Sequence, residues 1–258
     1  VFIAPTLKSI GIGNLFSDKS LSLKINWVTP CLTAISASFS ILFIASDKFS
    51  SLEKVQSIIK ELNDLSEKGF KEITLLGQNV DSYLWYGGGL KKDFSKASEI
   101  QKASSINFAK LLEMCALTQP KMRIRFSTSN PQDMSIDVIK IMAKYENICN
   151  YIHLPVQSGS DSVLKAMNRQ HTRKEYLDLV ENIFKIIPDC SISHDMISGF
   201  PDESEDDHKQ TLSLMENVKY SFGYMFKYSE RPGTLAAKKL EDNICLLYTS
   251  PSPRDDYE

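Results

Sequence analysis

The sequence predicts an α/β fold in which parallel strands alternate with helices, in an open sheet or in a partial (β/α) barrel. From residue 50 to about residue 242, apolar stretches of strand length alternate with amphipathic stretches of helix length. Several predicted strands also run directly into loops of glycine and small polar residues, where folds of this class bind ligands. The 258 residues suffice for one large α/β domain or two small ones.

The predicted elements of the first half form three helix–strand units. Ser50 and Glu53 suit a capping box, and the helix after them ends at Gly69. The apolar stripe of this helix consists of Val55, Ile58, Ile59, Leu62 and Leu65. The strand Glu72–Leu76 follows, then a helix at 106–117 with a strand at 122–127, and a helix at 135–145 with a strand at 151–154.

The second half continues the alternation. Ser160 is expected to cap a helix carrying Val163, Leu164 and Met167. Thr172 and Glu175 form the capping box of the next helix. The apolar stripe of that helix is Tyr176, Leu179, Val180, Ile183 and Ile187. A strand Ser191–Ser198, a helix at 204–218 and a strand at 222–228 complete the pattern.

The two ends of the chain differ from this pattern. Residues 1–49 show no lasting period and are expected to be a non-matching or poorly ordered segment, either a β-rich extension or a stretch that is not the native partner of residues 50–243. Residues 244–258 resemble translated sequencing-adapter sequence. The predicted organisation is therefore a barrel over 50–243 with these two segments attached.

Composition limits the function classes. A net charge of −2 gives no argument for nucleic-acid binding from bulk charge. The five cysteines are scattered without C-x-x-C spacing, which indicates reduced thiols and a cytoplasmic protein. The longest apolar run, at 41–45, is too short to cross a bilayer, and no secretory signal is expected. The histidines share no metal-ligand spacing, and no metal site is predicted.

The candidate binding residues follow predicted strands. Gln157 and Ser158 are the strongest, because they are short polar residues just after the strand at 151–154, which Pro155 ends. Gly77, Gln78 and Asn79 are further candidates and form either a pocket rim or a plain turn. Ser127 and Thr128 follow another predicted strand. Arg169 binds either a ligand carboxylate or the carbonyl groups of a helix end. No catalytic residue is assigned.

Other polar residues have a structural interpretation beside the functional one. Arg123 and Arg125 share a strand face and favour an internal salt bridge, while His153 and His194 favour core or network positions. Asp195 is either a pocket residue or part of a buried pair. The acidic residues Glu203, Glu205, Asp206 and Asp207 favour the dipole of a helix N-terminus over a metal. The aromatic loop 84–90 either stacks on an unpaired base or folds over the barrel mouth.

Six motifs in order resemble one family. They are LLGQNVDSY (75–83), RIRFSTSNP (123–131), HLPVQSGSD (153–161), MNRQHT (167–172), SGFPDE (198–203) and YSERPGT (228–234). Together they resemble the radical S-adenosylmethionine (SAM) methylthiotransferases, in particular the tRNA branch, over residues 50–243.

The resemblance implies a fold, cofactors and a reaction. The fold is a partial, TIM-like radical SAM barrel with parallel strands, flanked in the family by a second cluster domain and an RNA-binding β-domain. The cofactors are SAM and 4Fe-4S clusters, and the partner is the anticodon stem-loop of tRNA. The reaction converts N6-isopentenyladenosine to its 2-methylthio form. The resemblance implies SAM contacts by Gly77, Gln78, Asn79, Gln157 and Ser158, ribose contacts by Ser127 and Thr128, and a carboxylate contact by Arg169.

The chain also departs from the family. The radical SAM cluster needs three cysteines in a C-x-x-x-C-x-x-C loop before residue 50, and only Cys31 lies there. We therefore expect the chain as written to be inactive. Asp202 stands where the family prefers glycine, which matters if that position needs a positive φ. The alternative is a non-catalytic α/β module that binds a nucleotide-like ligand or RNA.

Overall fold

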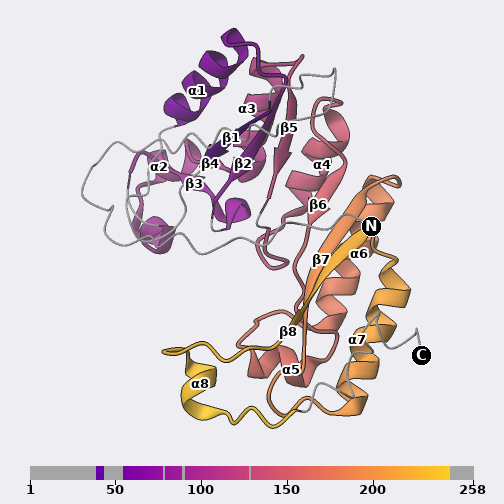
Figure 1. Ribbon diagram of the computed structural model, residues 1–258. Coiled ribbons are helices and arrows are strands. Elements are labelled where there is room, and N and C mark those ends of the chain that lie inside the picture. The colour runs from indigo at the N-terminus through magenta and orange to yellow at the C-terminus, as the bar shows by residue number, and fades with distance from the viewer. Residues whose placement is uncertain (1–38, 44–54, 78, 89–90, 128, 245–258) are drawn as a thin grey trace. The chain divides into compact units, whose positions relative to one another are not determined.

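The structure is a computed structural model that describes residues 39–43, 55–77, 79–88, 91–127 and 129–244 (Figure 1). Its larger elements up to the middle of the chain are β1 (Phe39–Phe43), α1 (Val55–Glu67), β2 (Glu72–Leu76), α3 (Phe108–Thr118), β5 (Arg123–Phe126) and α4 (Ile136–Lys144). The second half contains β6 (Tyr151–His153), α5 (Asp161–Ala166), α6 (Arg173–Ile186), β7 (Ser191–Ser198), α7 (Glu205–Val218), β8 (Phe222–Lys227) and α8 (Leu235–Lys239). Shorter elements are η1 (Val80–Ser82), β3 (Leu84–Trp85), η2 (Lys91–Lys96), α2 (Glu99–Ala103) and β4 (Ile106–Asn107).

The long strands pair in parallel. β1, β2 and β5 form one three-stranded sheet in that order, and β6, β7 and β8 form another. Ile124 of β5 also forms a parallel bridge with Ile148, just before β6. Parallel pairing places the carboxyl ends of neighbouring strands at one edge, so loops far apart in sequence meet there. The predicted α/β class with parallel strands is confirmed.

The first strand is not evident from the sequence. β1 lies within residues 1–49 and pairs with β2 in register from Phe39 opposite Glu72 to Phe43 opposite Leu76. Its sequence, FSILF, has no polar alternation and no turn signal at its ends, so periodicity does not separate it from its surroundings. The division of the chain at residues 50 and 243 remains a prediction.

The helix starts agree in part with the caps expected from the sequence. The predicted capping box of Thr172 with Glu175 in α6 is formed, and α7 has a further box of Ser204 with Asp207 that was not predicted. Ser160 occupies the N-cap position of α5 but makes no side-chain bond to the helix backbone. The predicted helix at 106–117 begins later, at Phe108, because residues 106–107 pair with β3 and the Asn107 side chain caps the helix. The predicted box of Ser50 and Glu53 lies outside the described residues.

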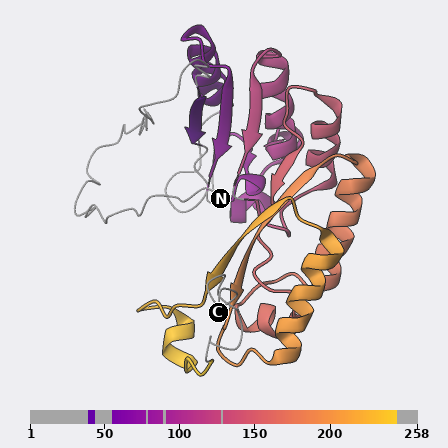
Figure 2. The ribbon, with the colours of Figure 1, turned by 45° about the vertical axis from the view of Figure 1, so that its right-hand side comes forward.

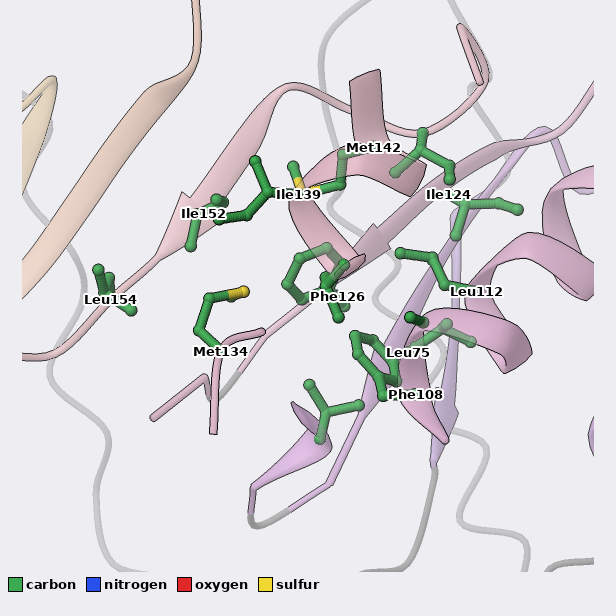
Figure 3. Close-up of a cluster of buried hydrophobic side chains, with 14 of the residues drawn as sticks. Leu75, Phe108, Leu112, Ile124, Phe126, Met134, Ile139, Met142, Ile152 and Leu154 are labelled. Carbon is green, nitrogen blue, oxygen red and sulfur yellow. The ribbon is translucent and has the colours of Figure 1, made fainter. Parts of the chain in front are cut away.

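Helices α3, α4 and α6 cover one face of the strands. Large side chains from β2, β5 and β6 meet those of α3 and α4 in a continuous core (Figure 3). Phe108 and Phe126 pack edge to face with ring centroids 5.3 Å apart. Figure 2 shows α6 and α7 along β7, where Tyr176, Ile183 and Leu214 are fully buried. The core occupies this face, and polar residues of the strands such as Glu72, Arg125 and Asp195 face the other way.

The aromatic loop after η1 folds inward. Tyr86 is 5% exposed and packs on Phe94, with ring centroids 5.2 Å apart, and Trp85 packs against the core. These rings are therefore not open to a base, and the folded-loop interpretation is the better one. None of the described helices has the length and apolar character needed to cross a membrane.

Candidate functional site

A cavity of about 470 Å³ lies at the carboxyl ends of β7 and β8. Its wall combines strand residues, the loop after β6, the segment between α5 and α6, and the segment after β8. The lining residues are Gln157, Arg169, Asp195, Ile197, Phe226, Lys227, Tyr228, Ser229, Arg231, Thr234 and Ala236. Two of the predicted binding residues, Gln157 and Arg169, therefore lie in one cavity although they belong to different loops.

A second hollow of about 490 Å³ lies at the other ends of the strands. Helix ends and the loops before β6 and β7 form it, and Arg123 is part of its wall. The guanidinium of Arg123 lies 3.5 Å from the carboxylate of Glu72 and is already paired. Because parallel α/β folds bind ligands at the carboxyl ends of their strands, the first cavity is the candidate site.

The backbone of Gln157 is held in a conformation that non-glycine residues rarely adopt. Its φ is 76°, in the left-handed region. The Gln157 amide donates to the carbonyl of Asp195 at 2.9 Å, and its carbonyl accepts from the amide of Ile197 at 2.9 Å. Two bonds to β7 thus impose the strained backbone and direct a side chain that is only 8% exposed. Strain maintained in this way at a cavity wall is typical of a functional position.

Arg169 stands at the rim of the same cavity. The turn after α5 positions it: Asn168 has a φ of 57°, and the Arg169 amide donates to the carbonyl of Leu164 at 2.8 Å. Desolvation lowers the pKa of its guanidinium. Among the described residues no carboxylate forms an ion pair with it. A cation placed in this way favours an anionic group of a ligand.

A hydrogen-bonded network positions Asp195. His153 Nε2 lies 3.4 Å from an Asp195 carboxylate oxygen, and His153 Nδ1 lies 2.8 Å from the hydroxyl of Ser193. The Tyr151 hydroxyl lies 2.7 Å from the same Ser193 oxygen. His153 is therefore a network histidine, as predicted, and Asp195 both belongs to this pair and lines the cavity. His194 points the other way and is 2% exposed.

The network extends to the neighbouring strands. The Arg125 guanidinium lies over the Tyr151 ring, 5.9 Å from its centroid, and donates to Glu72 at 3.0 Å. Glu72 therefore pairs with both Arg123 and Arg125, as the predicted salt bridge requires, but the Arg123 side chain is 63% exposed and is not internal. Charged residues on the concave face are thus paired with one another from β2 to β7.

Ser158 does not line the cavity, contrary to its expected place beside Gln157. It is fully buried, with its hydroxyl 3.2 Å from the Thr211 hydroxyl of α7. The Gly159 amide donates to the same Thr211 oxygen at 2.9 Å. The Ser160 hydroxyl donates to Asp207, which explains why it does not cap α5. These small residues fasten the start of α5 to α7.

The candidates after β2 and β5 form a separate polar cluster. Asn79 donates to Asp133, and Asp81 accepts from the Ser129 hydroxyl at 3.4 Å and from the Asn130 amide at 3.2 Å. Burial raises the pKa of the Asp81 carboxyl to about 7. Gly77 and Ser127 follow these strands, as predicted, but are not part of the cavity wall. Gln78 and Thr128 lie outside the described residues.

The acidic segment before α7 contains one exception to the dipole interpretation. Glu203 precedes the N-cap and is 6% exposed, and its carboxylate accepts from the amides of Gly199 and Phe200. It therefore closes the turn after β7. Asp202 has a φ of 64°, so this position does need a positive φ, and the Asn243 side chain bonds both its amide and its carboxylate.

The sequence interpretation assigned no role to the part of the cavity wall formed by β8 and the segment after it. Phe226, Lys227 and Arg231 contribute an aromatic ring and two cations to the cavity. A signal was present in FGYMFK, where aromatic residues alternate along a predicted strand. Which face of that strand they occupy depends on pairing with β7, and this could not be known from periodicity.

Comparison with known proteins identifies the family. The model of the radical SAM superfamily matches residues 43–215, more than half of the chain. The chain belongs to the radical SAM superfamily. This membership agrees with its parallel strands and intervening helices.

Curated relatives carry the name tRNA-2-methylthio-N(6)-dimethylallyladenosine synthase. The protein of Christiangramia forsetii is 73% identical over 73% of this chain and 39% of its own length. That of Flavobacterium johnsoniae is 67% identical over the same shares, and that of Karelsulcia muelleri 60% over 74% of this chain and 42% of its own length. The motif-based resemblance to methylthiotransferases is confirmed. This radical SAM chain spans about two fifths of the length of these relatives.

Several solved structures are distant matches. Coproporphyrinogen III oxidase of Escherichia coli, a radical SAM enzyme, is 16% identical over 85% of this chain and 50% of its own, with a TM-score of 0.49.

Proposed function

We propose that this chain is the central barrel segment of a tRNA methylthiotransferase, and that the cavity beside Gln157 binds SAM. In the whole protein the reaction would convert N6-isopentenyladenosine near the anticodon to its 2-methylthio derivative, in the cytoplasm. The observation that carries the proposal is that Gln157 and Arg169 line one cavity at the carboxyl ends of the strands in a radical SAM chain. The names of the relatives support the reaction.

The chemistry of the cavity residues suits SAM. The Arg169 guanidinium can pair with the SAM carboxylate through two parallel hydrogen bonds. The Gln157 amide can both donate and accept, and Asp195 offers acceptors for ribose hydroxyls. Since His153 and β7 already hold Asp195 and Gln157 in place, little ordering would accompany binding. Bound SAM supplies a reactive sulfonium, and these residues hold and orient it.

The described residues do not fit a 4Fe-4S cluster. Cys115, Cys149 and Cys190 belong to different elements, and no group of three potential metal ligands occurs in the described part of the chain. Burial raises the pKa of the Cys115 and Cys190 thiols to about 12, which opposes the thiolate form a cluster needs. We therefore derive no reaction step through a cluster, and we propose that this chain is inactive by itself.

Ligand binding tests the proposal without any cluster. Isothermal titration of the 258-residue chain with S-adenosylhomocysteine should show saturable binding. Gln157→Ala should weaken it by about 1–3 kcal/mol if the amide makes a buried hydrogen bond. Gln170→Ala is the matched control, because Gln170 is an exposed glutamine next to Arg169 and does not line the cavity. Equal affinities of the unchanged chain, Gln157→Ala and Gln170→Ala for S-adenosylhomocysteine would show that Gln157 does not contact the ligand.

A non-catalytic module that binds a nucleotide-like ligand or RNA is the second candidate. The observation that favours it is the lack of cluster ligands among the described residues. Both candidates predict binding in the cavity. They differ in whether a chain with the cysteine loop restored before residue 50 cleaves SAM under reducing, anaerobic conditions.

A further inference from the structure

The cavity face of β8 carries a ladder of aromatic rings. Phe222, Tyr224 and Phe226 follow one another with ring centroids 6.0 and 6.4 Å apart. At the lower end Phe222 stacks on Tyr151, with centroids 5.8 Å apart and ring planes within 7°. At the upper end Phe226 lines the cavity. The ladder thus runs from Tyr151, which belongs to the hydrogen-bonded network of β6, to Phe226 at the candidate site.

Pairing with β7 shows that these rings do not belong to the core. Tyr224 lies opposite Asp195, and Phe226 opposite Ile197, and both of these β7 residues line the cavity. The alternate residues of β7, such as Met196, are buried under the helices. Tyr224 and Phe226 remain 55% and 50% exposed. Exposed neighbouring rings on a concave face are typical of a binding surface.

The charges around the ladder indicate the kind of ligand. Lys227 and Arg231 stand next to Phe226 in the cavity wall, and no described residue forms an ion pair with either. SAM has one carboxylate, for which Arg169 suffices, and it has no phosphate. Two further cations beside stacked rings fit a phosphodiester backbone that carries an unpaired base.

We propose that Tyr224 and Phe226 stack an unpaired adenine base of an RNA, while Lys227 and Arg231 bind its flanking phosphates. The proposal rests on the proposed function and deepens it, because it assigns side chains to the RNA. The base enters at the open end of the ladder, beside the SAM residues Gln157 and Arg169. The Tyr151–Phe222 stack keeps the lower rings in place, so the platform is rigid before the base arrives.

A fluorescent base tests the stacking. The probe is a short oligouridine with a single central 2-aminopurine, whose emission falls when the base stacks. The 258-residue chain should quench this emission on binding. Tyr224→Ala and Phe226→Ala should each abolish most of the quenching and weaken binding roughly 5- to 100-fold. Phe226→Trp, which preserves a flat ring, should retain both.

Met225→Ala is the matched control. Met225 lies between the two rings on the same strand, is 49% exposed, and points to the opposite face. The Met225→Ala variant should bind the probe with the same affinity as the unchanged chain. A loss as large as that of Tyr224→Ala would show that β8 itself had been disturbed, and would overturn the proposal. The same conclusion follows if the unchanged chain neither binds nor quenches the probe.

Salt dependence and a second ligand separate the remaining outcomes. Lys227→Gln and Arg231→Gln should each reduce the slope of log affinity against log salt by about one unit for the RNA. Titration with S-adenosylhomocysteine should be unchanged in Tyr224→Ala. If Tyr224→Ala abolished that binding as well, the rings would serve the adenine of the cofactor and the proposal would fail. If the cofactor bound but RNA did not, this proposal alone would fail and the proposed function would stand.

Discussion

At the scale of single residues, the site depends on backbone conformations that side chains seldom adopt. Gln157 and Asp202 both have a positive φ, of 76° and 64°. Neighbours hold each of them: β7 bonds both sides of Gln157, and Asn243 bonds Asp202. For Asp202 the family's preference for glycine was a signal of this conformation. For Gln157 nothing in the sequence indicated strain, because the strain comes from pairing with β7.

The strain at Gln157 can be measured with two substitutions. Gln157→Gly and Gln157→Ala both remove the side chain, but only glycine adopts this φ without steric cost. We expect Gln157→Gly to be more stable than Gln157→Ala by about 1 kcal/mol in urea unfolding. Both should bind S-adenosylhomocysteine equally weakly. Equal stability would mean that the backbone relaxes when the side chain is removed.

Asp81 makes stability depend on pH. Its pKa is about 7 in the folded protein, against an ordinary value of 3.8. Between these two pKa values the Asp81 carboxyl is ionised in the unfolded chain but still protonated in the folded protein. The free energy of unfolding therefore falls as the pH rises through this range, and the loss is complete above pH 7. Asp81→Asn should gain stability relative to the unchanged protein by about 1–3 kcal/mol between pH 5 and pH 8.

The measurement is urea unfolding at both pH values. Asp64→Asn, at an exposed position of α1, is the control and should follow the unchanged protein. A parallel pH response of Asp81→Asn and the unchanged protein would mean that Asp81 is not the group responsible.

At the scale of elements, local signals were sufficient where the determinants are local. The capping box of α6 and the apolar stripe of that helix depend on residues three or four apart, and both were predicted. The contact of α5 with α7 was not, because Ser158 and Ser160 bind Thr211 and Asp207, about fifty residues later. The same reason applies to β8, whose cavity face is determined by β7.

The backbone of Gly159, just before α5, lies close to the backbone of α7. A Cβ there would lie 2.6 Å from the Gln210 carbonyl oxygen and from the Thr211 Cα, both backbone atoms of α7. Because a helix backbone cannot move aside locally, Gly159→Ala should destabilise the protein by about 1–3 kcal/mol.

Gly223→Ala is the comparison for Gly159→Ala. Its new Cβ would meet the His194 imidazole, which is a side chain and not backbone. Thermal unfolding should show the smaller loss for Gly223→Ala. The reverse order would show that α7 moves more easily than the buried imidazole.

At the scale of the whole molecule, the family could be recognised from the sequence because six of its motifs occur in order, although only some of them line the cavity. The cavity itself could not, because residues from β6 to α8 contribute to it. All of the predicted tail at 244–258 except residue 244 lies outside the described residues, as do Cys31 and most of the segment 1–49.

Iron content tests the expectation about the cluster. After anaerobic reconstitution with iron and sulfide, the 258-residue chain should hold far fewer than about four irons and lack a thiolate-to-iron absorption band. The reason is that only Cys31 lies near the required loop. About four irons per chain with that band would contradict the expectation.

The junction between β5 and β6 determines how the protein would open. Two backbone bonds join β5 to the segment just before β6, from the Ile124 amide to the Asn147 carbonyl at 2.8 Å and from the Cys149 amide to the Ile124 carbonyl at 2.9 Å. β7 and β8, by contrast, pair over six positions. In native-state hydrogen exchange, the amides of Ile124 and Cys149 should therefore exchange before those of β7, along a seam that leaves each three-stranded sheet intact. Opening along this seam would separate Arg125 from Tyr151, while Gln157, Asp195 and the aromatic ladder would stay together. The cavity would therefore remain formed after the two sheets had separated.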